Sequence, residues 1–216
     1  MLRLLFLCLL FTPQANACEI ALLLSIDISG SIDKGEYAIQ IEGLALALQE
    51  PAIVDSLVAG QMALAVVHWS GIDRQALVLP WQRMQSPSDV ARFAATVAAQ
   101  SRTFSASDTA VGQAIDFSAA QFTAVPDCTR KVIDISGDGP ENSGFTDAAA
   151  RTRTHALGIG INAIAIEDAG RSDPVTRYYQ KWVITKGGFV ITARGLADYP
   201  RAMREKLLRE VSKLIG

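Results

Sequence analysis

Oxygen-bearing side chains alternate in one short segment near the start of the chain. Asp27, Ser29 and Ser31 stand two residues apart in Asp-Ile-Ser-Gly-Ser, and Gly30 lets this loop turn tightly. One carboxylate and two hydroxyls are hard oxygen ligands, which suit Mg²⁺, or alternatively Mn²⁺ or Ca²⁺, better than zinc. The competing interpretation is a loop whose side chains only cap a helix. We expect a divalent-metal site in this segment.

Two further segments offer oxygen ligands. Asp138 follows a short apolar strand in Ser-Gly-Asp-Gly, and Thr109 opens a helix after a polar loop. Open α/β sheets bind ligands at the carboxyl ends of their strands, so these residues should reach the same rim as Asp27. Asp108 is either an additional ligand or, as we favour, the cap of the helix that begins at Thr109.

Asp134 is unusual because it lies inside an otherwise apolar strand, where an unpaired carboxylate is costly. By the alternation of a strand it shares a face with Ser136 and Asp138. We favour a hydrogen-bonded structural acid near the metal site. The alternative is that Asp134 binds the metal, or that it holds the metal ligands in position.

Strand-like and helix-like segments alternate along the whole chain, which favours an open sheet with helices on both faces. The turn at 70–73 is too short for a parallel crossover, so the third strand should pair antiparallel at an edge. Pro51 is expected to end the first helix. The sequence thus predicts a doubly wound α/β fold with a six-stranded, mostly parallel sheet. The expected strands are 19–26, 62–68, 75–79, 131–135, 159–166 and 188–192, and the expected helices are 33–49, 86–98, 109–122, 147–157, 173–184 and 196–215.

The first 17 residues resemble a secretory leader. Arg3 precedes an apolar run, and Ala15-Asn16-Ala17 forms a small-x-small cleavage signal. The alternative, a short membrane anchor, is disfavoured because the apolar run is too short to span a bilayer. We therefore expect a signal peptide at 1–17, a single domain at 18–216, and a periplasmic or secreted protein without a transmembrane span. The formal net charge is −2, and the sequence contains no cluster of basic residues that would indicate nucleic acid as a partner.

Cleavage after Ala17 would remove Cys8 and leave two cysteines, Cys18 and Cys128. An even number in an oxidising compartment favours one disulfide. The alternative is a lipid anchor on Cys18, the first residue of the mature chain.

The Asp27-x-Ser29-x-Ser31 motif directly after a buried strand resembles the metal-ion-dependent adhesion site of von Willebrand factor type A domains, and more narrowly an exported bacterial family of unassigned function. The resemblance covers essentially the whole mature chain, and it implies the Rossmann-like von Willebrand A fold. Asp27, Ser29 and Ser31 match the first motif of that family. Thr109 and Asp138 match its threonine and its second aspartate, although the loop before Thr109 lacks the family's usual glycines.

This resemblance also implies function. In such domains a carboxylate of a partner protein completes the coordination of the metal ion, so the expected partner presents an acidic side chain. The first and fourth strands would be neighbours, which would place Cys18 and Cys128 together at the edge opposite the metal.

Three hypotheses follow for the function. The first is a metal-dependent protein-binding module without enzymatic activity, since no nucleophile elbow, phosphate-binding loop or dinucleotide fingerprint is present. The second is a metal-dependent hydrolase, for which only Asp134 or His68 could act as general base. The third is a structural domain with a vestigial metal site.

Overall fold

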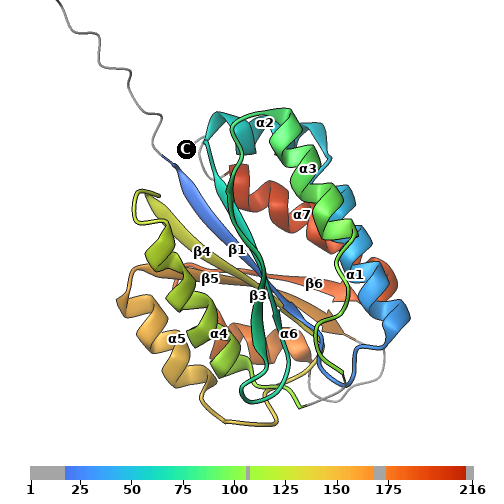
Figure 1. Ribbon diagram of the computed structural model, residues 1–216. Helices are drawn as coiled ribbons and strands as arrows, with labels where there is room; N and C mark the ends of the chain where they lie inside the picture. Colours follow the sequence, from blue (N-terminus) through green and yellow to red (C-terminus); the bar gives the residue numbers. More distant parts are fainter. Residues whose placement is uncertain (1–17, 106–107, 168–173, 213–216) are drawn as a thin grey trace, which may run out of the picture.

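The computed structural model describes residues 18–105, 108–167 and 174–212. The signal peptide predicted at 1–17 lies outside these residues. Six strands form one sheet, as the alternating pattern predicts, and their order is β3-β2-β1-β4-β5-β6 (Figure 1). The strands are β1 Ile20–Asp27, β2 Ala63–Trp69, β3 Gln75–Arg83, β4 Arg130–Gly137, β5 Ile159–Glu167 and β6 Val190–Arg194.

The pairing of the strands sets the position of the metal-binding motif. All neighbouring strands run parallel except β2 and β3, so the predicted antiparallel edge strand is confirmed. In the register of β1 and β4, Ile26 lies opposite Ser136. The two residues that follow, Asp27 and Gly137, therefore leave the sheet side by side at its carboxyl edge.

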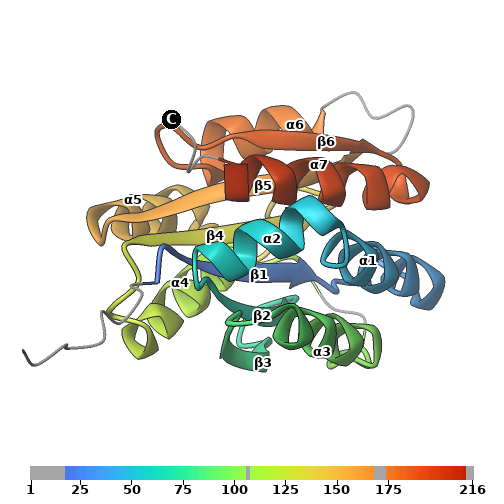
Figure 2. The same ribbon diagram turned by 90° about the horizontal axis from the view of Figure 1, so that it is seen from above.

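Helices cover both faces of the sheet, and each face has its own apolar core (Figures 1 and 2). One face carries α1 Lys34–Ala47, α2 Pro51–Ala59, α3 Pro87–Ala98 and α7 Tyr199–Ser212. The other carries α4 Val111–Ala120, α5 Asp147–Ala156 and the short α6 Val175–Tyr178. β1 is buried along its whole length because it is central and covered on both faces.

The first predicted helix divides into two. Its start is confirmed: Asp33 Oδ1 accepts a 2.8 Å hydrogen bond from Glu36 N, and Glu36 Oε2 accepts a 2.7 Å bond from Asp33 N. α1 ends at Ala47, and Pro51 then begins α2 instead of only ending the preceding helix. Proline suits the first position of a helix because the N–H it lacks would have no intrahelical partner there.

The predicted helices near the carboxyl end also differ from the observed ones. The helix predicted at 173–184 consists of the single turn α6 followed by a π-helical turn at Tyr179–Val183. The helix predicted at 196–215 is a 3₁₀ turn followed by α7. None of the helices in the described ranges is long and apolar enough to cross a membrane.

A disulfide joins Cys18 and Cys128, with their Cα atoms 4.4 Å apart. The predicted pairing is therefore present, and it occupies the Cys18 sulfur that a lipid anchor would need. Thr129 N donates a 2.8 Å hydrogen bond to Cys18 O, so the bridge connects the beginnings of β1 and β4. These strands begin at the edge of the sheet opposite Asp27.

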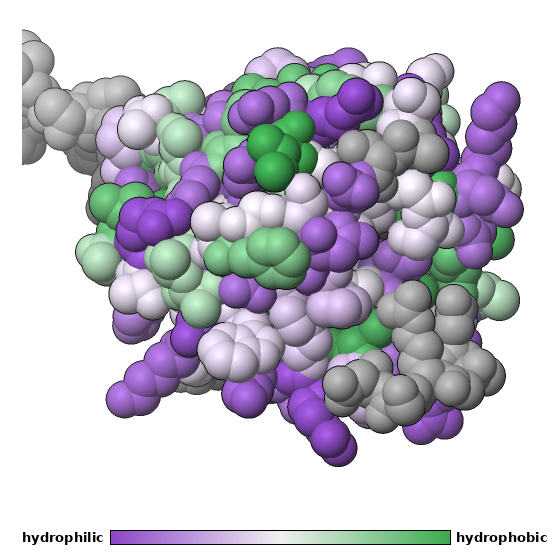
Figure 3. Space-filling view, turned by 90° about the horizontal axis from the view of Figure 1, so that it is seen from below, coloured by the Kyte–Doolittle hydropathy of each residue, from purple (hydrophilic) through white to green (hydrophobic). Residues whose placement is uncertain are grey.

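Figure 3 shows the face of the molecule that is seen from below in the view of Figure 1. Hydrophobic side chains on this face occur in separate groups among hydrophilic ones. Scattered apolar residues of this kind are normal on the surface of a folded domain.

Candidate metal centre

The predicted metal-binding loop begins at the last residue of β1. Asp27 is fully buried, and its Oδ1 accepts a 2.7 Å hydrogen bond from the Ser29 backbone N–H. This bond turns the chain sharply, and Ile28 N still donates to Trp69 O of β2. The start of the loop is thus fixed by two hydrogen bonds, and the side chains of Asp27 and Ser29 are both buried.

Hydrogen bonds link the loop to the second carboxylate. Ser29 Oγ and Ser31 Oγ lie 3.3 Å apart, and the Ser31 hydroxyl donates a 2.8 Å bond to Asp138 Oδ1. Four of the five predicted ligands, namely Asp27, Ser29, Ser31 and Asp138, therefore belong to one connected group at the carboxyl ends of β1 and β4.

The electrostatics of this group fit a bound cation. Asp27 Oδ2 is buried and has no hydrogen-bond partner among the described residues. Burial is the main reason why the pKa of Asp27 is raised to about 7, and the negative charge of Asp138 raises it further. A buried carboxylate oxygen without a donor is costly, and a divalent ion would satisfy it and offset the repulsion between the two acids.

The donor set is that of a site with few charges. Within the described ranges, no three His, Cys, Asp or Glu side chains come together as a metal-binding group. Asp27 and Asp138 would therefore share an ion with the hydroxyls of Ser29 and Ser31. This mixed set of oxygens matches the preference of Mg²⁺ or Ca²⁺, and it leaves coordination positions for other ligands.

Thr109 lies on the same rim, and its backbone groups, not its hydroxyl, make the hydrogen bonds that hold it there. Thr109 N donates a 2.8 Å bond to Asn142 Oδ1, and its carbonyl accepts from Asn142 N and Ser143 N. The following residue, Ala110, donates to Ser70 O just beyond β2. Thr109 is thus held between the loops that follow β2 and β4, and coordination of metal by its hydroxyl stays a prediction.

Arg102 supports the metal-binding loop from outside. Its Nη2 donates hydrogen bonds of 2.7 Å to Ile28 O and 2.8 Å to Ser29 O. Both acceptors are backbone groups of the loop that carries Ser29. A guanidinium that binds two carbonyls fixes the path of this loop without competing for its side-chain oxygens.

The prediction that Asp108 caps the following helix is wrong. The N-cap of α4 is Ala110, and no side chain caps this helix. The Asp108 side chain is exposed, and its carbonyl accepts a 3.3 Å bond from Ser70 Oγ. A contribution of its carboxylate to the metal site stays a prediction.

Asp134 is a structural acid, as we favoured, but its partners belong to α7 and not to the metal-binding loop. Its Oδ1 lies 2.6 Å from Lys206 Nζ, which also lies 3.1 Å from Glu210 Oε1. All three side chains are almost completely buried. The predicted location beside the metal ligands is therefore corrected: strand alternation placed Asp134 on the right face of β4, yet α7 occupies that face.

His68 is a buried structural histidine. Its Nδ1 lies 2.9 Å from Thr103 Oγ1, its Nε2 lies 3.4 Å from Tyr37 Oη, and burial lowers its pKa to about 4. The ring is therefore neutral at physiological pH and engaged by hydroxyls on both sides.

Three residues near the site were missed by the sequence reasoning. Arg102 could have been noticed as a lone basic residue in a polar loop on an acidic rim. Glu141 accepts bonds from Gly112 N, Thr146 N and Asp147 N, and so orders the loop after Asp138. Tyr179 gave no signal, because the π-helical turn that directs it inward has no recognisable sequence pattern.

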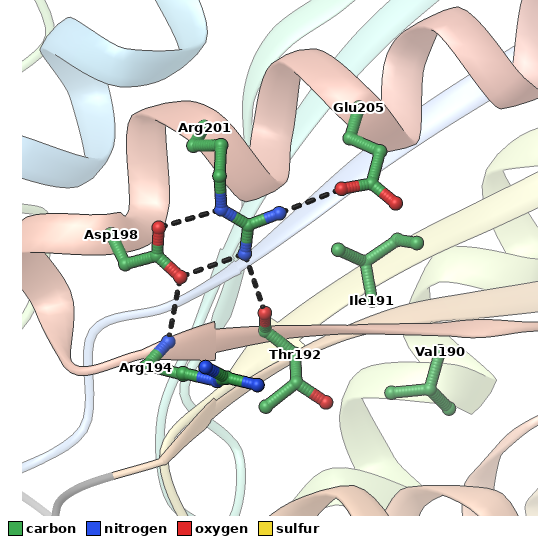
Figure 4. Close-up of a pocket in the computed structure, with 7 residues that line it drawn as sticks. All are labelled: Val190, Ile191, Thr192, Arg194, Asp198, Arg201 and Glu205. Atoms are coloured by element: carbon green, nitrogen blue, oxygen red, sulfur yellow. Dashed lines mark hydrogen bonds and ion pairs between the residues drawn. The ribbon is translucent and has the colours of Figure 1, made fainter.

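A separate hollow lies along the edge strand β6 (Figure 4). It has a volume of about 690 Å³ and contains none of the predicted metal ligands. Arg201 crosses it, with Nε 2.6 Å from Asp198 Oδ1 and Nη1 2.6 Å from Glu205 Oε2. The Arg201 guanidinium is thus paired with acids that line the hollow, and we assign the hollow no ligand.

Known structures share this fold. A von Willebrand factor type A protein from Catenulispora acidiphila is 20% identical with a TM-score of 0.59, over 93% of this chain and 43% of that chain. Proximal thread matrix protein 1 from the mussel byssus, solved with zinc in its MIDAS (metal-ion-dependent adhesion site) motif, is 17% identical with a TM-score of 0.67, over 91% and 48%. The open pilus adhesin SpaC from Lactobacillus rhamnosus GG is 11% identical with a TM-score of 0.66, over 93% and 31%.

The order of the strands and these likenesses define the fold as that of a von Willebrand type A domain. The chain itself belongs to the family described as "Protein of unknown function (DUF1194)", whose profile matches residues 17–215. No curated protein matches the sequence. The chain spans between about a third and a half of the three structures named above, so likeness to them concerns the fold alone.

Proposed function

We propose that this protein is an exported, divalent-metal-dependent protein-binding module and not an enzyme. Asp27, Ser29, Ser31, Thr109 and Asp138 would hold the ion, with Mg²⁺ the first candidate and Mn²⁺ or Ca²⁺ the alternatives. The observation that carries this proposal is the buried, partnerless Asp27 Oδ2 next to a second carboxylate. An ion bound by two acids and neutral hydroxyls stays electrophilic, and a carboxylate of a partner protein is a ligand that can complete its shell.

Exposed apolar side chains beside the site support a protein partner. Phe145 is 78% exposed and Ile72 is 46% exposed, and they lie on the loops that follow β4 and β2. A Cβ placed on Gly144 would lie 3.9 Å from Ile72 Cγ1, so the two loops lie close together. Large exposed apolar residues that are rimmed by polar ones are typical of binding surfaces.

The loop that carries Phe145 is held in place. Glu141 Oε2 accepts a 2.6 Å bond from Thr146 N, and the Tyr178 hydroxyl accepts a 3.1 Å bond from Glu141 N. Phe145 itself has a positive φ of 51°, which is unfavourable for a bulky residue and persists only where the surroundings fix it. A loop whose backbone is already held in place loses less conformational entropy on binding a partner.

The hydrolase alternative has less support. His68 and Asp134 were the only candidates for a general base, but His68 is enclosed by Tyr37 and Thr103, and Asp134 is paired with Lys206. Neither group is placed to accept a proton at the rim. The third hypothesis, a vestigial site, would be supported by a lack of metal affinity.

Export is proposed from the leader pattern at 1–17 and from the Cys18–Cys128 disulfide, which is typical of an oxidising compartment. The similar folds of a pilus adhesin and a byssus protein are compatible with a role outside the cytoplasm. Fractionation of cells that express the full chain would locate the protein in the periplasm or the medium, and retention in the cytoplasm would contradict this part of the proposal.

The decisive experiment is a calorimetric titration of purified 18–216 with Mg²⁺, Mn²⁺, Ca²⁺ and Zn²⁺, with Asp27→Ala as the comparison. We expect binding in the micromolar to millimolar range that is lost in Asp27→Ala. Immobilised wild-type protein should then capture a partner that EDTA releases and that the Asp27→Ala column does not retain. Failure of the wild type to bind any of these ions would favour the structural hypothesis.

A further inference from the structure

A second buried oxygen without a partner faces the candidate metal centre. Tyr179 is completely buried, and its hydroxyl has no hydrogen-bond partner among the described residues. A buried hydroxyl without a partner is costly, so a native structure that contains one usually provides a water, an ion or a function for it.

Gly137 shows where this hydroxyl points. A Cβ placed on Gly137 would clash with Tyr179 Oη and would lie 3.0 Å from Asp27 Oδ2. Tyr179 Oη therefore lies where a side chain at residue 137 would be, and Asp27 Oδ2 borders the same place, so the two partnerless oxygens are close neighbours. They form no direct hydrogen bond, but a single water molecule can connect two such oxygens.

We propose that Tyr179 is a positioning residue of the metal centre: through one water between the two oxygens, its hydroxyl donates to Asp27 Oδ2 and orients this carboxylate toward the ion. This inference rests on the proposed metal site and adds to it a residue outside the family motif. Outer partners of this kind hold the ligands of a metal in their binding geometry.

The two oxygens of Asp27 have different environments, which explains why a second donor is needed. Oδ1 is fixed by the Ser29 backbone N–H, whereas Oδ2 receives no bond from the described part of the chain. Burial, and secondarily the charge of Asp27, hold the pKa of Tyr179 well above its usual range. The hydroxyl therefore keeps its proton and acts as a donor toward the carboxylate.

The local backbone directs Tyr179 inward. Tyr179 begins the π-helical turn Tyr179–Val183, and both of its end residues are fully buried. Turns of this kind are rare and occur frequently at functional sites, where they redirect a side chain. The edge of the Tyr178 ring packs against Tyr179, with ring centroids 5.4 Å apart, and so restricts its orientation.

The test is Tyr179→Phe, which removes one oxygen atom and keeps the ring. The matched control is Tyr199→Phe, because Tyr199 is equally buried but packs into the core on the other face of the sheet. We would titrate Mg²⁺ and Mn²⁺ into wild type and both variants by calorimetry, and record thermal unfolding with and without each ion.

In Tyr179→Phe we expect the dissociation constant for Mg²⁺ to rise about tenfold or more, and the stabilisation caused by the ion to decrease accordingly. The unfolding temperature of the metal-free protein should change little, since the lost hydroxyl makes no direct hydrogen bond to the described protein groups. Tyr199→Phe should keep the wild-type dissociation constant. An unchanged constant in Tyr179→Phe would overturn the inference and leave the metal site intact, and absence of binding in the wild type would overturn both.

Discussion

Ser31 and Asp138 are 107 residues apart in the sequence, yet the Ser31 hydroxyl donates a 2.8 Å hydrogen bond to Asp138 Oδ1. The bond exists because β1 and β4 are parallel neighbours that end together. It also holds the two side chains together at the rim, where the Ser31 hydroxyl can bind an ion through a lone pair while it donates its proton to Asp138.

The first prediction concerns the charge of Asp138. Asp138→Asn keeps the size of the side chain and an oxygen that can accept from Ser31, but removes one of two carboxylates. We expect Mg²⁺ affinity to fall about 10- to 100-fold, in the range found when a metal site loses a supporting group. The metal-free protein should become more stable, because the charge of Asp138 destabilises ionised Asp27.

Calorimetry and urea unfolding would measure both effects. Asp55→Asn is the control, because Asp55 is an exposed acid on α2, away from the rim. An Asp138→Asn protein that binds Mg²⁺ like the wild type would exclude this carboxylate from the site.

The second prediction concerns pH. The pKa of Asp27 is about 7 in the folded protein, compared with 3.8 for an ordinary aspartate, which represents the unfolded chain. Between these pH values Asp27 is protonated in the folded state and ionised in the unfolded state. Its contribution to the stability of the metal-free protein is therefore greatest near pH 4 and decreases as the pH rises to 7. Burial also raises the pKa of Asp134 to about 6, and this works in the same direction.

Urea unfolding of metal-free protein should therefore show greater stability at pH 5 than at pH 8, by an amount on the order of a few kcal/mol. Asp27→Asn, which mimics the protonated side chain, should remove most of this difference. Mg²⁺ must displace the proton, so its affinity should weaken below pH 7 and its binding should release protons. A metal affinity that is constant from pH 5 to pH 8 would contradict the assignment of Asp27 as a ligand.

Most of the fold could be predicted because its signals are local. Each strand is a short apolar run, and the brief turn at 70–73 permits only antiparallel pairing. The division at Pro51 was missed because proline both ends a helix and begins one, and only packing decides between these outcomes.

The site was predictable where the motif is continuous in sequence and less so elsewhere. Asp27, Ser29 and Ser31 lie in one loop, and the strand order brings Asp138 to them. Asp134 was misplaced because strand alternation gives the face of a side chain but not the helix that covers it. Its partner, Lys206, lies 72 residues further along the chain, where a lysine in an amphipathic helix would normally be exposed.

The third prediction concerns this buried ion pair. Lys206→Met would leave Asp134 and Glu210 buried without a counter-charge, and we expect it to destabilise the protein by about 3 to 5 kcal/mol. Arg204→Met is the control, since Arg204 lies on the exposed side of the same helix and pairs with Glu50 at the surface, so its loss should cost much less. Urea unfolding at pH 7 would compare them, and equal losses in the two variants would show that the buried pair contributes nothing specific.

The last prediction separates partner binding from metal binding. Phe145→Ser removes an exposed aromatic ring beside the site and leaves every predicted ligand in place. We expect the metal-dependent capture of the partner to weaken by tenfold or more, as for a central aromatic contact of an interface, while the calorimetric affinity for Mg²⁺ stays at the wild-type value. Serine should also relieve part of the strain of the positive φ, so the variant should fold normally.

Leu157→Ser is the matched control for this experiment. Leu157 is 67% exposed, close to the 78% of Phe145, but it follows α5 and immediately precedes β5, at the edge of the sheet opposite the metal. If both variants capture the partner equally well, the apolar surface beside the metal has no part in binding. If Phe145→Ser alone fails, while its Mg²⁺ affinity is preserved, the partner contacts the rim at two places: the ion, through a carboxylate, and the loop after β4, through an apolar side chain.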